Sequence, residues 1–392
     1  MRRQLGALFL FCVIDTLGFG ILVPLVPYMA TRFGVAPQYI TPILGSYSLC
    51  QLLAAPWWGR LSDRYGRRPI LMGSLAGACA SYVLLALAGN VWVLLASRML
   101  AGFMAGNIAA AFAYASDVSA PERRAGALGL IGAAVGLGFS LGPPLGGLLA
   151  GPDAATADFL RPALASIGLS LLAILLVRFV LPESRTAAAH SPGAAARARA
   201  GPLRLLRERP ALGRLAAATL SVTYSQAILE SIFAIWALRR FGFGPRTVGL
   251  LLFGIALPAL VMQGGVVRTL APRVGEARLG MAGVLTYVAG LVVLSLAHSL
   301  PLTAVGLLCC GLGLGAYNPC AYALASRQTH GEDRGAVLGA YSASGSLARV
   351  LGPFSSGPLY ALLGPAAPFL VGACVTLPAA WLVRGVRAPR GP

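Results

Sequence analysis

The sequence has few charged side chains, and it contains no lysine. Only 12 of its 392 residues are Asp or Glu, all 31 basic residues are arginine, and 11% of the chain is charged. An ordinary soluble domain is about 25% charged. Hydrophobic residues instead make up 57% of the chain, and the mean hydropathy is +0.76. The composition therefore excludes an ordinary soluble domain and indicates an integral membrane protein.

The sequence also lacks the residue clusters that enzymes, metal sites and disulfide frameworks need. Its three histidines, His190, His298 and His330, are in or near loops without an acid-rich motif, and its seven cysteines show no ligand spacing. No enzymatic activity, cofactor or metal is expected. The net charge of +19 would suit nucleic acid, but the arginines fall between apolar spans rather than in one domain. No nucleic-acid partner is expected either.

Twelve apolar spans are expected, each long enough to cross a bilayer. They lie near residues 5–29, 40–61, 70–89, 91–115, 125–150, 161–181, 211–238, 246–268, 277–298, 301–325, 335–360 and 366–384. Most arginines outside the spans lie on the side that the two termini share, and the opposite loops carry only Arg32, Arg161, Arg239, Arg240 and Arg246. By the positive-inside rule, both termini are expected in the cytoplasm, in a multi-pass protein of the inner (plasma) membrane.

The polar interval 182–210 separates the first six spans from the last six and is expected to be a cytoplasmic linker. The flanking halves, 1–181 and 211–392, repeat short motifs: RFGVAP at 32–37 returns as RFGFGP at 240–245. Because six spans separate the copies, the repeats run parallel across the membrane. This pattern predicts two halves of six spans each that repeat one another.

A charged turn is expected between the second and third spans, where residues 59–69 read GRLSDRYGRRP. Asp63 lies among four arginines, and Gly59 and Gly66 would let backbones approach closely. The turn resembles the loop between the second and third helices of the major facilitator superfamily at Gly59, Leu61, Asp63, Arg64, Gly66, Arg67, Arg68 and Pro69.

This resemblance implies an all-α membrane protein of twelve transmembrane helices in two pseudo-symmetric six-helix bundles. It also implies a cytoplasmic gate made by Gly59, Asp63, Arg64, Gly66, Arg67 and Asp117. In that gate, Arg67 meets Asp117, and Asp63 meets the start of the eleventh helix near Gly335. The alternative is that these charges only set the topology.

The fifth span repeats small residues, reading GAAVGLGFSLGPPLGG at 132–147. Gly138, Gly142 and Gly146 recur every four residues and predict a groove against a neighbouring helix. With Pro143 and Gly147 they resemble the G-(x)n-G-P-x-x-G-G motif of antiporters in the superfamily. The resemblance implies an exporter. The alternative is that these residues only allow close helix packing, and both interpretations can hold together.

Asp15 and Glu230 are the acids that lie deep within expected spans, where a charge costs several kcal/mol unless it is paired, hydrated or protonated. Both are expected to carry protons. The alternatives are a structural pair or backbone cap at Asp15 and a position near the outer surface for Glu230. The resemblance places Arg98 at a fourth-helix arginine that acts in proton transfer, and the alternative there is a permanent structural contact.

Six polar residues inside the spans are expected to line a substrate cavity, although each would equally satisfy a backbone carbonyl at a Gly or Pro break. They are Tyr47, Gln51, Gln226, Gln263, Asn318 and Tyr322. The chain is most similar to drug:proton antiporters of the tetracycline-exporter group. It departs from them at Ser81, where those exporters carry an acid, and near Ala259, where they carry a histidine.

The resemblance implies a monomer in the lipid bilayer whose partners are protons and a small-molecule substrate. Its expected function is export of a small amphipathic, drug-like compound by alternating access. A metabolite facilitator or importer of the same superfamily is the alternative.

Overall fold

The computed structural model describes residues 2–120, 123–184, 202–328 and 334–386. These residues are largely helical and contain no strand. The chain divides into two compact units, one of residues 1–190 with 234–253 and the other of residues 191–233 with 254–392. Most of the expected linker, residues 185–201, lies outside the described residues, so the domain division expected at 182–210 stays a prediction.

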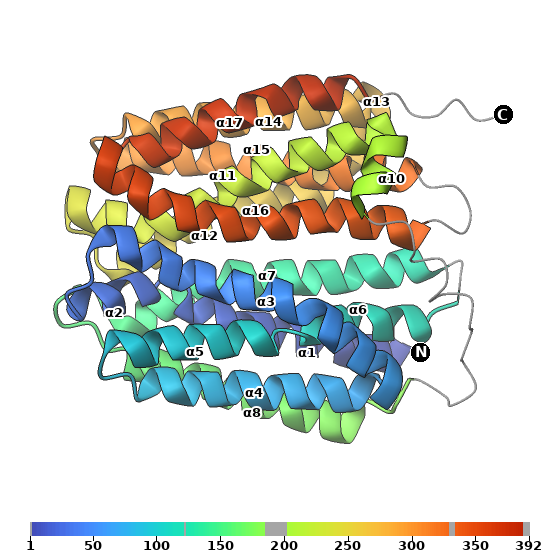
Figure 1. Cartoon of the computed structure of the whole chain (residues 1–392), viewed down its shortest axis with the longest axis horizontal. Helices are drawn as coiled ribbons and strands as arrows, with labels where there is room; N and C mark the ends of the chain where they lie inside the picture. Colours follow the sequence, from blue (N-terminus) through green and yellow to red (C-terminus); the bar gives the residue numbers. More distant parts are fainter. Residues whose placement is uncertain (1, 121–122, 185–201, 329–333, 387–392) are drawn as a thin grey trace. The chain divides into compact units, whose positions relative to one another are not determined.

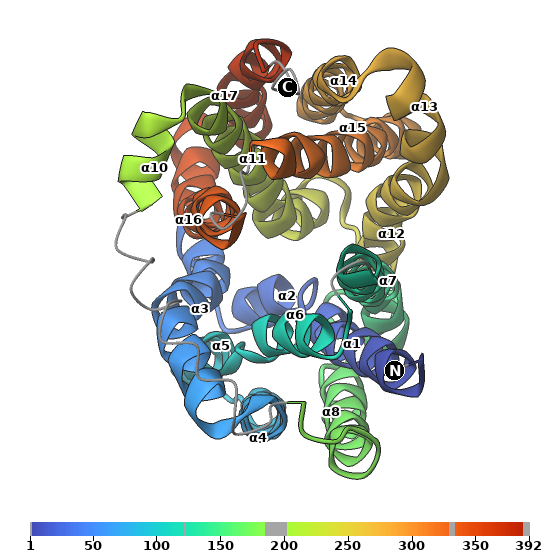
Figure 2. The same ribbon diagram turned by 90° about the vertical axis from the view of Figure 1, so that its right-hand side faces the viewer.

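The first unit packs its helices, labelled in Figure 1, around an apolar core. Its helices are α1 (Arg2–Leu22), α2 (Val26–Arg32), α3 (Pro37–Tyr65), α4 (Arg67–Ala86), α5 (Val91–Met104), α6 (Asn107–Asp117), α7 (Arg124–Ala150) and α8 (Leu160–Val180). Helix α1 packs along α7 and α8, and α4 packs along α5 and α8 (Figure 2). Leu8, Phe11, Leu75, Tyr114 and Val177 are fully buried between these helices.

The second unit relies on small residues for close helix packing. Its elements are α10 (Pro202–Glu208), α11 (Pro210–Phe241), α12 (Pro245–Val261), the π-helix η2 (Met262–Val266), α13 (Val267–Val274), α14 (Glu276–Ser295), α15 (Leu300–Arg327), α16 (Arg334–Leu363) and α17 (Ala367–Arg384). The last residues of α11 and the first of α12 belong to the first unit. A Cβ atom on Gly283 would lie 2.8 Å from the carbonyl oxygen of Gly313, so α14 and α15 pack at backbone distance.

Each of the twelve expected spans is helical, and three of them are irregular inside. The first is interrupted at residues 23–25 and the fourth at Ala105–Gly106, and the eighth passes through η2. Within the described residues, nine helical segments are long and apolar enough to cross a membrane. The three remaining spans, α3, α11 and α16, are richer in Ser, Thr, Tyr and Gln.

The structure corrects the charged turn expected at 59–69. Helix α3 continues to Tyr65 and α4 begins at Arg67, so Gly66 alone interrupts the helices. Gly66 has φ 98°, a conformation that favours glycine, and a Cβ atom there would lie 2.7 Å from Glu183 Oε2. In the part of the chain that the structure describes, a Cβ atom on Gly59 would meet nothing within 4 Å. The structure thus shows no close backbone approach at Gly59 among the described residues, and at Gly66 the close neighbour is a side chain.

Candidate functional site

Asp15 is buried in the first unit, where α1 faces α6. Its side chain is enclosed so fully that the residue is only 8% exposed. Asn107, the first residue of α6, donates from Nδ2 to Asp15 Oδ2 at 2.6 Å and is itself 5% exposed. A hydrogen bond from an amide to a carboxylate stabilises the charged form. Asp15 thus has one strong donor in surroundings that otherwise disfavour a charge.

A cavity of about 30 Å³ lies beside the Asp15 carboxyl. Its walls include Phe19, Tyr47, Tyr82 and Asn107, and the Phe19 and Tyr47 rings lie 4.7 Å apart. A buried water needs roughly 10 to 15 Å³ of such space and two to four polar partners. The cavity therefore has room for about two waters beside a carboxyl, an amide and two phenols.

Arg98 is buried on α5 without an acidic partner. The residue is 2% exposed, its Nε lies 3.5 Å from Ser97 Oγ, and its Nη2 has no hydrogen-bond partner. Among the described residues, no acid forms an ion pair with Arg98. Tyr82, which lines the cavity beside Asp15, is also buried. The alternative of a structural pair between Asp15 and a buried arginine does not match this arrangement.

The small residues of α7 pack directly against α1, the helix that carries Asp15. A Cβ atom on Gly142 would lie 2.6 Å from Cα of Gly20, and one on Gly138 would lie 2.8 Å from the carbonyl oxygen of Val13. Gly146 similarly packs against Ile21 of α1. The groove expected from the four-residue spacing is confirmed, and α1 is the helix that fills it.

Pro143 and Gly147, the remaining residues of the α7 motif, face the start of α12. A Cβ atom on Gly147 of α7 would meet the backbone of Arg246 in α12. A Cβ atom on Gly249 of α12 would meet the backbone of Pro143 in α7. Helix α7 nevertheless continues through Pro143 to Ala150. The motif as a whole therefore packs two helices against α7.

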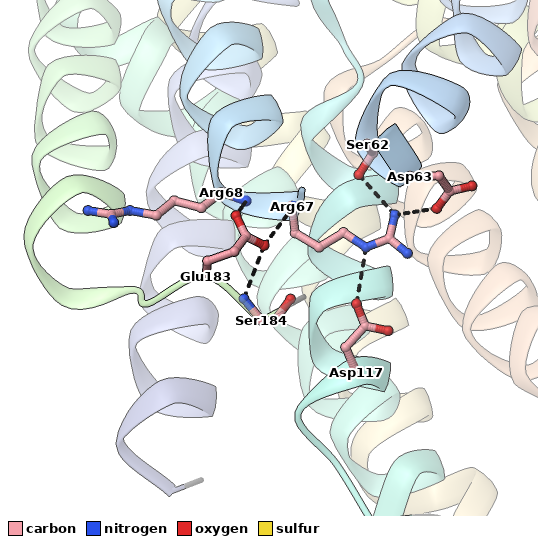
Figure 3. Close-up of polar contacts among 7 residues, drawn as sticks. All are labelled: Ser62, Asp63, Arg67, Arg68, Asp117, Glu183 and Ser184. Carbon is pink, nitrogen blue, oxygen red and sulfur yellow. Dashed lines mark hydrogen bonds and ion pairs between the residues drawn. The ribbon is translucent and has the colours of Figure 1, made fainter. Parts of the chain in front are cut away.

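A cluster of charges joins α3, α4 and α6 (Figure 3). Arg67 donates from Nε to Asp117 Oδ2 at 3.1 Å and from Nη1 to Asp63 Oδ1 at 2.9 Å. The contact between Arg67 and Asp117 expected from the sequence is thus present. It lies within the first unit, so by itself it does not connect two halves. The contact expected between Asp63 and the start of the eleventh helix stays a prediction, as does a gating role for Gly59, Arg64 and the rest of this set.

Glu183, which follows α8, holds the first turn of α4. Its carboxylate accepts the backbone N–H groups of Arg67 and Arg68 at 2.9 and 3.1 Å (Figure 3). Arg68 in turn donates to the carbonyl oxygen of Arg178 in α8. A carboxylate at a helix amino terminus is favoured by the helix dipole. Glu183 therefore compensates for the positive charge that Arg67 places at this terminus.

The second unit has an ion pair at the corresponding junction between a helix start and a helix end. There the acid begins a helix and the arginine ends one, the reverse of Arg67 and Asp117. Gly275, with φ 90°, precedes Glu276, the first residue of α14, and Arg327, the last residue of α15, donates to Glu276 Oε1 at 2.7 Å. Acids at amino termini and bases at carboxyl termini are favoured by the helix dipole. Both charges of this pair have the favoured sign, whereas Arg67 and Asp117 both have the opposed sign.

Glu230 in the second unit has partners on two sides. Gln226, one turn earlier in α11, donates to Glu230 Oε1 at 2.8 Å, which confirms that the two share a helix face. Arg349 Nη1 lies 3.7 Å from Glu230 Oε2, and the two side chains are 50% and 43% exposed. Partly exposed pairs of this length contribute little stability. A proton-coupling role for Glu230 stays a prediction.

The other residues expected to line a substrate cavity are dispersed. Tyr47 lines the cavity beside Asp15, whereas Gln51 is partly buried on α3 and does not line it. Gln263, Asn318 and Tyr322 are exposed in the second unit, with Gln263 inside η2. Their role in binding a substrate stays a prediction.

Sequence reasoning missed Asn107, Tyr82 and Glu183. Asn107 directly follows Gly106 in the fourth span, so a lone amide after a glycine was the available signal.

Ser81 does not replace the missing acid of the third helix, because it is buried and donates to Ala78 of its own helix. In the described ranges, no group of three His, Cys, Asp or Glu side chains is placed to hold a metal ion.

Comparison with known proteins identifies the family. The family model described as Major Facilitator Superfamily matches residues 8–327 and 269–392. The chain belongs to the major facilitator superfamily. It is therefore a multi-pass membrane transporter and not an enzyme, and the expected fold of twelve helices in two bundles is confirmed.

Its relatives within the superfamily include tetracycline-resistance proteins. The class G protein of Vibrio anguillarum is 32% identical, over 92% of this chain and 91% of that protein. Human major facilitator superfamily domain-containing protein 10 is 28% identical, over 94% of this chain and 90% of that protein. The resemblance to tetracycline exporters is confirmed.

A solved structure with the same fold is that of the human organic anion transporter MFSD10 (TETRAN). It has 26% sequence identity and a TM-score of 0.73, and the similarity covers 97% of this chain and 99% of that one. This chain is therefore similar both to tetracycline-resistance proteins and to a protein described as an organic anion transporter.

Proposed function

We propose that this superfamily member is a proton-coupled antiporter that exports a small amphipathic, drug-like compound by alternating access. It acts as a monomer in the plasma membrane, with both termini in the cytoplasm. The observation that carries the proposal is the Asp15 carboxyl, buried beside a cavity and without a basic partner among the described residues. Similarity to tetracycline-resistance proteins gives independent support.

The physical argument concerns the cost of a charge at Asp15. A carboxylate at membrane depth costs several kcal/mol unless it is paired, hydrated or protonated. Asn107 supplies one hydrogen bond, and the cavity has room for only about two waters. Taking up a proton is the remaining way to lower the cost. Protonation of Asp15 from outside and its release to the cytoplasm then alternate with substrate release and uptake.

The proton gradient supplies enough energy for such a cycle. One elementary charge crossing the membrane is worth about 2.3 kcal/mol per 100 mV. The packing of α7 against α1 supports the coupling, because a change around Asp15 is passed to α7 through the backbone contacts at Gly138 and Gly142. Arg98, which is buried on α5, is the second proposed member of the relay, and Glu230 is the proposed member in the second unit.

Everted membrane vesicles provide the test. A panel of amphipathic compounds is offered with an imposed pH gradient, and uptake is compared for wild type, Asp15→Asn and Asp153→Asn. Asp153 is an exposed acid after α7 and serves as the matched control. Uptake that depends on the gradient in wild type and Asp153→Asn, and is lost in Asp15→Asn, is the expected result. Unchanged gradient dependence in Asp15→Asn contradicts the proposal.

An organic anion is the second candidate substrate. The observation that favours it is the buried Arg98, whose Nη2 has no partner, together with similarity to the human organic anion transporter. The same vesicles distinguish the candidates when matched anionic and cationic dyes are compared. A facilitator or importer, in contrast, exchanges substrate by counterflow without any proton gradient.

A further inference from the structure

We propose that Asn107 is the positioning residue that sets the pH range of transport by holding the carboxylate of Asp15 from the break between α5 and α6. The inference rests on the proposed function, because it assigns a residue to the same proton site. It differs from the function itself, which requires only that Asp15 bind a proton.

The break in the fourth span is fixed by packing on both sides. Helix α5 ends at Met104, α6 begins at Asn107, and a Cβ atom on Gly106 would lie 2.5 Å from Cγ of Trp58. Two side chains donate hydrogen bonds to backbone carbonyl groups near the break. Trp58 Nε1 donates to Phe103 O at 2.5 Å, and Ser74 Oγ donates to Met104 O. These bonds add to the backbone bond from Gly106 N–H to Met104 O at 2.8 Å, and together they stabilise the break.

This break gives Asn107 its position at the start of a helix. Its Oδ1 accepts the backbone N–H of Ile108 at 3.0 Å, which leaves the Nδ2 group to donate to Asp15. The amide is thus tied to its own helix through one atom and to α1 through the other. Because Asn107 and Asp15 are both buried, bulk water does not compete for this bond.

The strength of this bond depends on the proton at Asp15. A hydrogen bond with one ionised partner is roughly twice as strong as a neutral one. When Asp15 is ionised, the bond holds α6 to α1, and when Asp15 takes up a proton, the bond weakens. Asn107 therefore favours the ionised form and transmits the change of charge to the break.

Other groups around Asp15 do not replace this donor. The titratable or charged neighbours are Cys12 on α1, Tyr47 on α3, Tyr82 on α4 and Arg98 on α5. Helix α7 faces the cavity with a phenyl ring, and α6 with Asn107 and an isoleucine. Among the described residues, Asn107 is the group that donates a hydrogen bond to this carboxyl.

The test measures the pH at which exchange is half-maximal in proteoliposomes. Asn107→Leu keeps the branching of the side chain and removes the donor, and Asn107→Ser keeps a shorter donor. Loss of the donor disfavours the ionised form, so the midpoint of Asn107→Leu is expected to rise by about one pH unit, with Asn107→Ser in between. The substrate KM is also compared well above the midpoint pH, where Asp15 is ionised in every variant, and is expected to stay within about twofold, since a purely structural defect would change it.

Several outcomes are distinguishable. If wild type shows no pH-dependent exchange, or Asp15→Asn keeps it, the proposed function fails. If Asp15→Asn removes the pH dependence but Asn107→Leu leaves the midpoint unchanged, the function stands and the role of Asn107 is overturned. If Asn107→Leu is not recovered as a folded protein, the smaller Asn107→Ala gives the same comparison, and an unchanged midpoint there likewise overturns the inference.

Discussion

The exchanged charges at the two helix junctions predict which junction is the more stable. In the second unit, Glu276 begins α14 and Arg327 ends α15, so each charge is favoured by its helix dipole. The double variant Glu276→Arg with Arg327→Glu keeps an ion pair but reverses both signs. It isolates the contribution of the helix ends from the contribution of the pair.

The magnitude follows from the positions of the two side chains. A charge of the favoured sign at a helix end is worth about 0.3 to 1 kcal/mol, and reversal converts each gain into a cost. Glu276 is 17% exposed, but Arg327 is 56% exposed, which screens its share. The expected loss in the free energy of unfolding is therefore about 1 to 2 kcal/mol.

Thermal unfolding in detergent measures this loss. For a unit of about 200 residues, the melting temperature should fall by roughly 2 to 8 °C. The control is Arg327→Lys, which keeps the sign and is expected to change stability by less than about 0.5 kcal/mol. A double variant as stable as wild type would refute the argument that the helix ends distinguish the two junctions.

Three further predictions concern the first unit. Gly142→Ala brings a Cβ within 2.6 Å of Gly20 and should cost about 1 to 3 kcal/mol in thermal unfolding, whereas Gly136→Ala on the same helix, with nothing within 4 Å, should be near neutral. Glu183→Gln weakens the carboxylate cap on α4 and should lower stability by about 0.3 to 1 kcal/mol, less at high salt. Tyr47→Leu removes a cavity ring and should raise the Kd for an aromatic substrate about threefold to tenfold, measured by binding; no change would exclude Tyr47 from the binding site.

Local sequence patterns predicted much of the fold. The spacing of Gly138, Gly142 and Gly146 predicts a helix groove because residues four apart share one helix face, and α1 fills that groove. The twelve spans follow from the length of the apolar runs, which the thickness of a bilayer dictates. The pairing of Arg67 with Asp117 followed from family resemblance rather than from spacing.

Contacts between distant segments were not predictable from local patterns. Glu183 caps a helix that begins 116 residues earlier, and Asn107 meets an acid 92 residues away, so neither pairing leaves a periodic signal. The turn expected at 59–69 was wrong because its charged residues suit the last turn of α3 as well as a loop. Sequence alone also did not show that Arg349 is the partner of Glu230.

Proton movement driven by substrate tests the central claim most directly. Proteoliposomes that contain a trapped pH indicator are given a substrate gradient without any imposed pH gradient. Wild type should move protons against the direction of the substrate, and Asp15→Asn should transport substrate, if at all, without moving protons. Equal proton movement by wild type and Asp15→Asn would contradict the assignment of Asp15 as the proton carrier.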